Sequence, residues 1–158
     1  MNILLDIHQE TIRLMQKYQV EFMLIGGYAV IYHGYGRTTG DMDLWLKPTN
    51  ENKKKLIKAF AENGYEKDDL EQMDELNFEE HVVFSIGSEP QKIDFITRIT
   101  LVEYEAAEKN MVSGEIDGIT IPIIHLNDLV LSKINTGRMK DLADIEELQR
   151  IHQFPKNN

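Results

Sequence analysis

The stretch that decides the fold, residues 25–46, reads IGGYAVIYHGYGRTTGDMDLWL. It begins at the end of a short apolar run, residues 22–25, that has the length and composition of a buried strand. Two glycines follow, then residues 28–33 with helical spacing, and then a polar turn. Residues 41–46 alternate polar with apolar side chains, as a strand with one buried face does. The stretch therefore predicts a strand, a glycine pair, a short helix and a second strand, in that order.

Two carboxylates open the second of these strands. Asp41 and Asp43 are two residues apart, so both side chains project from the same face of the strand. Carboxylate oxygens suit Mg²⁺, which fills its other positions with water and phosphate oxygens. Gly26 and Gly27 let a phosphate approach the backbone closely. An Asp-x-Asp triplet alone is most often part of a solvated strand edge, and a glycine pair alone is most often a turn. The order of the two motifs in this stretch predicts a site for a metal and a phosphate.

Length, composition and charge limit the function classes. The 158 residues, 42% apolar and 28% charged, fit one soluble domain spanning residues 1–158. No apolar run is long enough to cross a bilayer, the N-terminus lacks a signal-peptide pattern, and there is no cysteine, so we expect a cytoplasmic protein without membrane contact. The net charge of −10 argues against broad nucleic-acid binding. It leaves open a local basic patch, or a nucleotide that enters with magnesium.

The flanking segments predict an α+β fold: a mixed sheet with helices packed on it and a C-terminal helical pair. The expected helices are one within residues 1–20, one over 50–63, one opened by a capping box at 100–103, and two within 125–152, the first capped by Asn127. Strands are expected over 81–86 and 92–96, and a hairpin around Asp117-Gly118. Lys53–Lys55 and Lys58 are expected on a solvated helix face, with phosphate binding as the alternative. The acidic residues 68–80 suggest a short helix within a loop.

Residues 25–46 resemble the corresponding stretch of the nucleotidyltransferase superfamily related to DNA polymerase beta. The residues that carry the resemblance are Gly26-Gly27-Tyr28-Ala29, His33-Gly34, Arg37-Thr38-Thr39 and Asp41-Met42-Asp43-Leu44. Within the superfamily they are most similar to the AbiEii-like toxins of abortive-infection and toxin–antitoxin systems, and to the lincosamide and aminoglycoside nucleotidyltransferases. The resemblance implies the nucleotidyltransferase fold.

The resemblance also implies a set of site residues. Asp94, a lone acid between apolar residues, is expected as a third catalytic and metal-binding carboxylate beside Asp41 and Asp43; its alternative is an ion pair with Arg98 or a lysine. Nucleotide contacts are expected from Gly26, Gly27, Arg37, Thr39, Lys133, Arg138, Lys140 and Asp141. For Asp141 and Asp144 the alternative is favourable helix-dipole electrostatics. Many superfamily members have serine where this chain has Gly27, so backbone N–H groups would contact the triphosphate there.

The implied activity is transfer of a nucleoside monophosphate from a nucleoside triphosphate to a hydroxyl group, with two Mg²⁺ ions, or Mn²⁺ in their place. The acceptor is left open among tRNA, a protein and a small molecule. A toxin with an antitoxin protein as its partner is one interpretation. The alternatives are a catalytically inactive binding protein of the same fold, and an antibiotic nucleotidyltransferase acting on a lincosamide or aminoglycoside.

Overall fold

The computed structural model describes residues 3–153, which form helices and strands in mixed order. These are α1 (Asp6–Lys17), β1 (Phe22–Ile25), α2 (Gly26–Tyr32), β2 (Met42–Leu46), α3 (Asn50–Glu62), α4 (Lys67–Asp74), β3 (Val83–Ile86), β4 (Ile93–Ile96), α5 (Tyr104–Asn110), β5 (Val112–Ile116), β6 (Ile119–Ile123), α6 (Leu126–Lys133) and α7 (Met139–His152). The first two residues of the expected N-terminal helix, and residues 154–158 of the expected domain, lie outside the described part of the chain.

The strands form one six-stranded sheet in the order β3-β4-β2-β1-β6-β5. The central pairing of β1 with β2 is antiparallel, whereas β2 runs parallel to β4 and β1 parallel to β6. The outer strands β3 and β5 pair antiparallel with their neighbours. The α+β architecture with a mixed sheet, predicted from the sequence, is confirmed.

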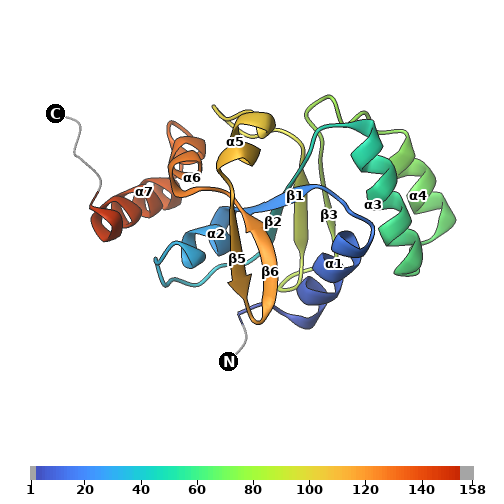
Figure 1. Cartoon of the computed structure of the whole chain (residues 1–158), viewed down its shortest axis with the longest axis horizontal. Coiled ribbons are helices and arrows are strands. Elements are labelled where there is room, and N and C mark those ends of the chain that lie inside the picture. Colours follow the sequence, from blue (N-terminus) through green and yellow to red (C-terminus); the bar gives the residue numbers. More distant parts are fainter. Residues whose placement is uncertain (1–2, 154–158) are drawn as a thin grey trace.

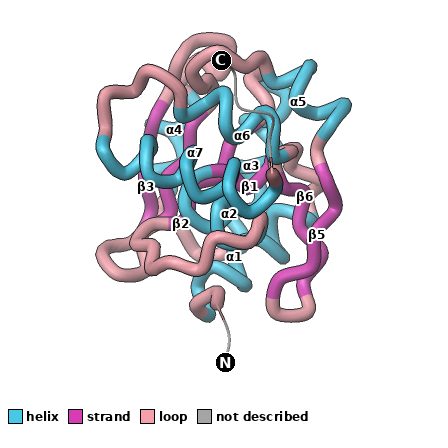
Figure 2. Tube along the Cα trace, turned by 90° about the vertical axis from the view of Figure 1, so that its left-hand side faces the viewer, coloured by secondary structure: helices cyan, strands magenta, loops and turns pink. Residues whose placement is uncertain are grey.

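Helices cover the sheet on both sides. In Figure 1, α1, α3 and α4 lie on one side and α2, α6 and α7 on the other. Figure 2 looks onto the second side, with α2 and α7 in front of the strands. The C-terminal pair predicted within residues 125–152 is confirmed, and it lies beside α2, the short helix that begins at the glycine pair (Figure 2).

The core is centred on the two middle strands. All four residues of β1 are buried, and Met42 and Leu44 of β2 have no solvent exposure. Leu44 lies opposite Phe95 of β4, which packs edge-on against Phe60 of α3 with ring centroids 5.8 Å apart. One face of β2 is thus fixed in the apolar core, so the alternate residues Asp41 and Asp43 project from the other face.

Two predicted helix starts are wrong. The helix expected from a capping box at residues 100–103 begins at Tyr104, with Glu103 at its N-cap and no side-chain cap. Leu101 has a φ of +64°, and Ile99 bridges Val102, so this segment is a turn that cannot continue a helix. The cap of α6 is His125, whose Nδ1 accepts a hydrogen bond of 3.0 Å from the Asn127 backbone N–H, instead of Asn127 itself.

The prediction that Lys53 lies on a solvated helix face is also wrong. Its side chain is buried, and the ammonium donates hydrogen bonds to the carbonyls of Asp74 (2.7 Å) and Leu76 (2.9 Å). The segment after α4 folds back over α3, and Lys53 supplies the hydrogen-bond donor for these two carbonyls. The periodicity of α3 alone could not indicate this contact. Lys53 therefore anchors the α4 region to α3.

Replacing Lys53 with methionine should destabilise the fold by about 2 kcal/mol, because two carbonyls lose a charged donor while the apolar stem is kept. Chemical denaturation measures the change. Lys54→Met, on the exposed face of the same helix, is the control and should change stability by less than about 0.5 kcal/mol. Equal effects of the two substitutions would contradict the anchoring role.

No helix within residues 3–153 is long and apolar enough to cross a bilayer.

Candidate nucleotide and metal site

Three carboxylates meet at one end of the central strands. Asp43 of β2 lies directly opposite Asp94 of β4, because the two strands run parallel in this register. Asp41 comes one residue before β2, on the same face as Asp43. The structure therefore brings the three predicted acids to the same face of two neighbouring strands.

The surroundings of Asp43 disfavour its charged form. Burial, and then the negative charges of Asp94 and Asp41, raise the pKa of Asp43 to about 6, although the charges of Lys133 and Lys140 act in the opposite direction. A carboxylate in this state is stabilised by any cation that binds beside it. The cluster thus favours binding of a cation.

Lys92 supplies one positive charge to this cluster. Its ammonium lies 3.3 Å from Asp94 Oδ1 and 3.5 Å from Asp41 Oδ2. This is the ion pair with a lysine that the sequence left open for Asp94. Within the described residues, Oδ1 of Asp41 remains buried without a hydrogen-bond partner. Lys92 therefore compensates the cluster only in part.

The residues fit a divalent ion that is shared with a phosphate. No three His, Asp or Glu side chains within residues 3–153 are gathered closely enough to enclose a metal by themselves. Mg²⁺ does not require such a cage, since it commonly takes one or two carboxylates and completes its shell with water and phosphate oxygens. The hard oxygen donors, the unpartnered Asp41 oxygen and the raised pKa of Asp43 agree with this kind of site.

The two glycines create the space around the carboxylates. A Cβ on Gly26 would lie 2.2 Å from Oδ2 of Asp43, and the φ of +68° at this residue is one that other residues rarely adopt. A Cβ on Gly27 would lie 2.1 Å from Oγ1 of Thr39. A serine at position 27 would therefore collide with Thr39, which gives a physical reason for glycine here.

Replacing Gly27 with alanine should destabilise the protein by about 1–3 kcal/mol, because the new methyl group overlaps the Thr39 hydroxyl. Adding Thr39→Gly removes the obstructing side chain and should restore part of the loss. Thermal unfolding of the two single variants and the double variant measures the coupling. Strictly additive losses would show that the two residues do not compete for this space.

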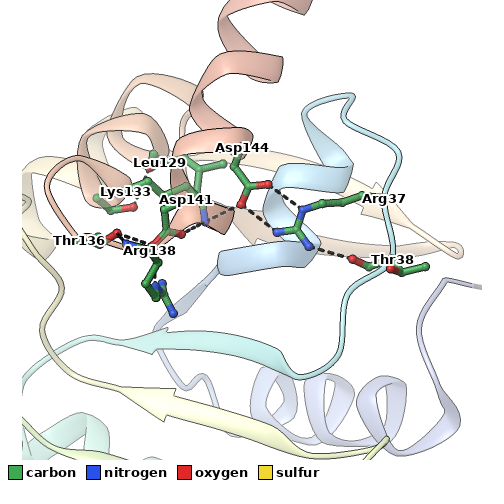
Figure 3. A network of polar contacts seen from close by, with 9 residues as sticks. Arg37, Thr38, Leu129, Lys133, Thr136, Arg138, Asp141 and Asp144 are labelled. Carbon is green, nitrogen blue, oxygen red and sulfur yellow. Dashed lines mark hydrogen bonds and ion pairs between the residues drawn. The ribbon is translucent and has the colours of Figure 1, made fainter.

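A buried ionic network joins the polar turn, the segment between α2 and β2 that contains Arg37, to the C-terminal helices (Figure 3). Arg37 donates from Nε and Nη2 to the two oxygens of Asp144, at 2.7 and 2.9 Å. The ammonium of Lys133 lies 3.0 Å from Asp144 and 3.0 Å from Asp141. Both acids are 1% exposed and Lys133 is 9% exposed. Lys133 is thus held between two carboxylates.

Asp141 is the second centre of this network. It accepts hydrogen bonds of 2.6 Å from the Thr136 hydroxyl and from Nε of Arg138. Burial raises the pKa of Asp141, but its hydrogen bonds to Thr136, Lys133 and Arg138 outweigh this and lower the pKa. Arg138 itself is 71% exposed, so most of its guanidinium faces solvent.

A cavity of about 290 Å³ collects these groups. It is lined by all eleven residues that the sequence singled out, Gly26, Gly27, Arg37, Thr39, Asp41, Asp43, Asp94, Lys133, Arg138, Lys140 and Asp141, together with Gly40 and Glu89. Five carboxylates face four cationic side chains in this lining. A polyanion such as a triphosphate would therefore need accompanying cations to enter.

A comparison with protein families gives a match over nearly the whole chain. Residues 2–154 match the model of a family described as nucleotidyltransferase of unknown function, DUF6036. The chain belongs to this nucleotidyltransferase family. A search of curated protein sequences finds no match.

Solved structures share the fold of this nucleotidyltransferase family member. The lincosamide antibiotic adenylyltransferase LnuA, in its lincomycin-bound form, is 15% identical with a TM-score of 0.57, and the match covers 96% of this chain and 99% of LnuA. A candidate nucleotidyltransferase of Thermotoga maritima, TM1012, is 11% identical with a TM-score of 0.55, covering 95% of this chain and 97% of that protein. At these identities the likeness shows the fold alone, which agrees with the nucleotidyltransferase fold predicted from residues 25–46.

Three residues of the candidate site were absent from the predicted set. Lys92 and Glu89 were not singled out, and Asp144 was considered only in the pattern around Asp141. The spacing of Asp141 and Asp144, three residues apart on one helix, places both on one face and could have indicated a joint role. The spacing of Lys92 and Asp94, two residues apart in one extended segment, places both on the same face and could have indicated their ion pair, whereas the second partner of Lys92, Asp41, is 51 residues away in the sequence.

Proposed function

We propose that this protein transfers a nucleoside monophosphate from a nucleoside triphosphate to a hydroxyl group and releases pyrophosphate. The observation that carries the proposal is the cavity in which Asp43 and Asp94 lie opposite each other and face the cationic side chains of α6, α7 and the polar turn. This reaction requires carboxylates that bind metal cations and cationic side chains that bind phosphate. Membership of a nucleotidyltransferase family supports it.

The divalent ions belong to the same proposal. Asp41, Asp43 and Asp94 would hold Mg²⁺, as one or two ions, with Mn²⁺ as a substitute. When bound, the ions would neutralise the phosphate oxygens and lower the pKa of the attacking hydroxyl. The excess of carboxylates over cationic groups in the cavity favours a nucleotide that arrives as its magnesium complex.

Each residue has a role that its position supports. Gly26 and Gly27 leave room for the phosphates, and the exposed Arg138 and Lys140 would contact them. The oxygen of the acceptor hydroxyl would bond to the α-phosphorus as the bond from that phosphorus to the pyrophosphate leaving group breaks. Asp94 would accept the proton that the hydroxyl loses. The Ser85 hydroxyl donates to Asp94 Oδ1 at 2.5 Å and so orients this carboxylate.

The test is incubation with each α-³²P-labelled nucleoside triphosphate, Mg²⁺ and a total cell extract. One labelled fraction should appear, and EDTA should remove the signal. Isothermal calorimetry with the same nucleotides distinguishes the inactive alternative. Binding without transfer to any fraction would favour a binding protein of this fold, and neither binding nor transfer would refute the proposal.

Two narrower assignments differ in their support. The lincomycin-bound structure of LnuA favours trying a small-molecule acceptor, since the shared fold covers nearly all of both chains. The comparisons lend no support to an AbiEii-like toxin with an antitoxin partner, so that interpretation stays a prediction from the sequence. Labelling of kanamycin or lincomycin in place of a cell fraction would support the antibiotic assignment.

A further inference from the structure

We propose that a second, larger cavity holds the acceptor, and that this acceptor carries a phosphate group; the inference rests on the proposed function. The cavity has a volume of about 700 Å³ and shares Gly26, Asp43, Asp94, Lys133 and Arg138 with the nucleotide cavity. The carboxylates thus lie where the two cavities meet. A hydroxyl group that enters the larger cavity can therefore reach Asp94.

The larger cavity lies over the β3–β4 edge of the sheet. Side chains from both of these strands line it, and the turn after β4 and the α6–α7 connection complete its wall. The lining mixes apolar residues, among them Val83, Ile96 and Ile99, with the hydroxyls of Ser85, Thr100, Ser132 and Thr136. A compound with apolar surface and several hydrogen-bonding groups would fit this lining.

Cationic side chains gather in this cavity. Lys92, Arg98, Lys133 and Arg138 line it, beside the carboxylates Asp43 and Asp94. Lys133 and Arg138 are ion-paired with Asp141, and Lys133 also with Asp144. Arg98 and Lys92 are therefore the cations of this lining that are left to attract an anion.

Arg98 carries the specificity of this cavity. Its guanidinium is oriented by hydrogen bonds from Nε (3.2 Å) and Nη2 to the Glu79 carbonyl, which do not neutralise its charge. The acid paired with it, Glu103, lies 3.8 Å away and is 85% exposed, so that solvent screens the pair. An oriented guanidinium that is 45% exposed and weakly paired is suited to bind a phosphate.

Lys92 adds a second anion-binding group. Its ammonium now lies against Asp41 and Asp94, the carboxylates proposed to bind the divalent ion. A divalent ion held by those carboxylates would replace the ammonium as their partner, and Lys92 would then be available to an anionic acceptor. The cavity therefore becomes more favourable to an anion in the state that carries out the transfer, and an aminoglycoside, which is a polycation, is disfavoured.

Binding to the whole protein with Mg²⁺ tests the inference. Ribose 5-phosphate and ribose, titrated by calorimetry, form a matched pair that differs in the phosphate, and a fluorescent RNA 12-mer, followed by anisotropy, represents phosphate on a polymer. We expect ribose 5-phosphate or the RNA to bind and ribose to bind at least about tenfold more weakly, as loss of a charge-assisted hydrogen bond predicts. Which of the two binds identifies the source of the phosphate.

The matched variants are Arg98→Gln and Arg150→Gln. Arg150 lies on α7, is 70% exposed and pairs with Glu147, so it controls for loss of one surface charge. Arg98→Gln should weaken phosphate binding about tenfold or more, and Arg150→Gln should leave it unchanged. Equal weakening by the two variants, no difference between ribose 5-phosphate and ribose with no RNA binding, or tighter binding of kanamycin by the Arg98→Gln variant would each overturn the inference.

The proposed function has a separate measure. Labelling of kanamycin or lincomycin by a nucleoside triphosphate would overturn the phosphate-bearing acceptor and uphold nucleotidyl transfer. Absence of nucleotide binding would count against nucleotidyl transfer, and with it the acceptor role of the larger cavity, whatever the affinity for ribose 5-phosphate. The two failures therefore give different results.

Discussion

Replacing Asp43 with asparagine should abolish nucleotidyl transfer and, in the absence of divalent ions, make the fold more stable. Asp43 lies opposite Asp94 and lines both cavities. Asparagine keeps the size of the side chain but removes the charge needed to bind a cation. We expect a loss of activity of about 10³-fold or more, which corresponds to about 4 kcal/mol of transition-state stabilisation.

The gain in stability follows from the pKa of Asp43. This pKa is about 6 in the folded protein and about 3.9 in an unfolded chain. Between these two values the folded state binds more protons, so the contribution of Asp43 to stability falls as the pH rises from about 4 to about 6. Above that window the ionised, buried carboxylate disfavours folding by up to about 3 kcal/mol, and asparagine removes this cost.

Thermal unfolding in EDTA at pH 4 and pH 8 measures this effect. The Asp43→Asn variant should unfold at a higher temperature than the unmodified protein at pH 8, with a smaller difference at pH 4. Asp68→Asn, an exposed acid in the first turn of α4, is the control and should change neither activity nor pH dependence. Retained transfer activity in the Asp43→Asn variant would be incompatible with the proposed mechanism.

Replacing Asp144 with asparagine should have the largest effect on folding. The carboxylate accepts two hydrogen bonds from Arg37 and forms an ion pair with Lys133, and it is 1% exposed. Without it, Arg37 loses the one carboxylate with which it pairs among residues 3–153, and Lys133 keeps Asp141 alone. Leaving buried cations uncompensated costs about 3–5 kcal/mol, which lowers the melting temperature by roughly 10 °C in a protein of this size.

A control lies on the same helix. Glu147 forms an exposed ion pair with Arg150, so Glu147→Gln should cost less than about 0.5 kcal/mol. Combining Asp144→Asn with Arg37→Met removes the stranded guanidinium and should recover part of the lost stability, as a double-mutant cycle would show. If Asp144→Asn behaves like Glu147→Gln, the network does not fasten the C-terminal helices to the polar turn.

The sequence predicted the fold well because local patterns determined most of its elements. Alternation in residues 41–46 fixed which face of β2 carries the acids, and Asp117-Gly118 marked the β5–β6 hairpin. The errors fell where a side chain or a turn depends on distant residues. Lys53 is buried by the segment after α4. Leu101 adopts a left-handed backbone conformation, so no helix begins at residues 100–103 as expected.

By itself, the sequence determined the order of strand, glycine pair, helix and carboxylate strand, because these patterns repeat over neighbouring residues. Only the tertiary structure decided how the charges pair. The parallel register of β2 and β4 sets Asp43 against Asp94, and the packing of α6 against α7 places Lys133 between Asp141 and Asp144. The packing of α7 onto the polar turn brings Arg37 to Asp144. Electrostatic pairing depends on distances in space between residues up to 107 positions apart, and no local pattern encodes those distances.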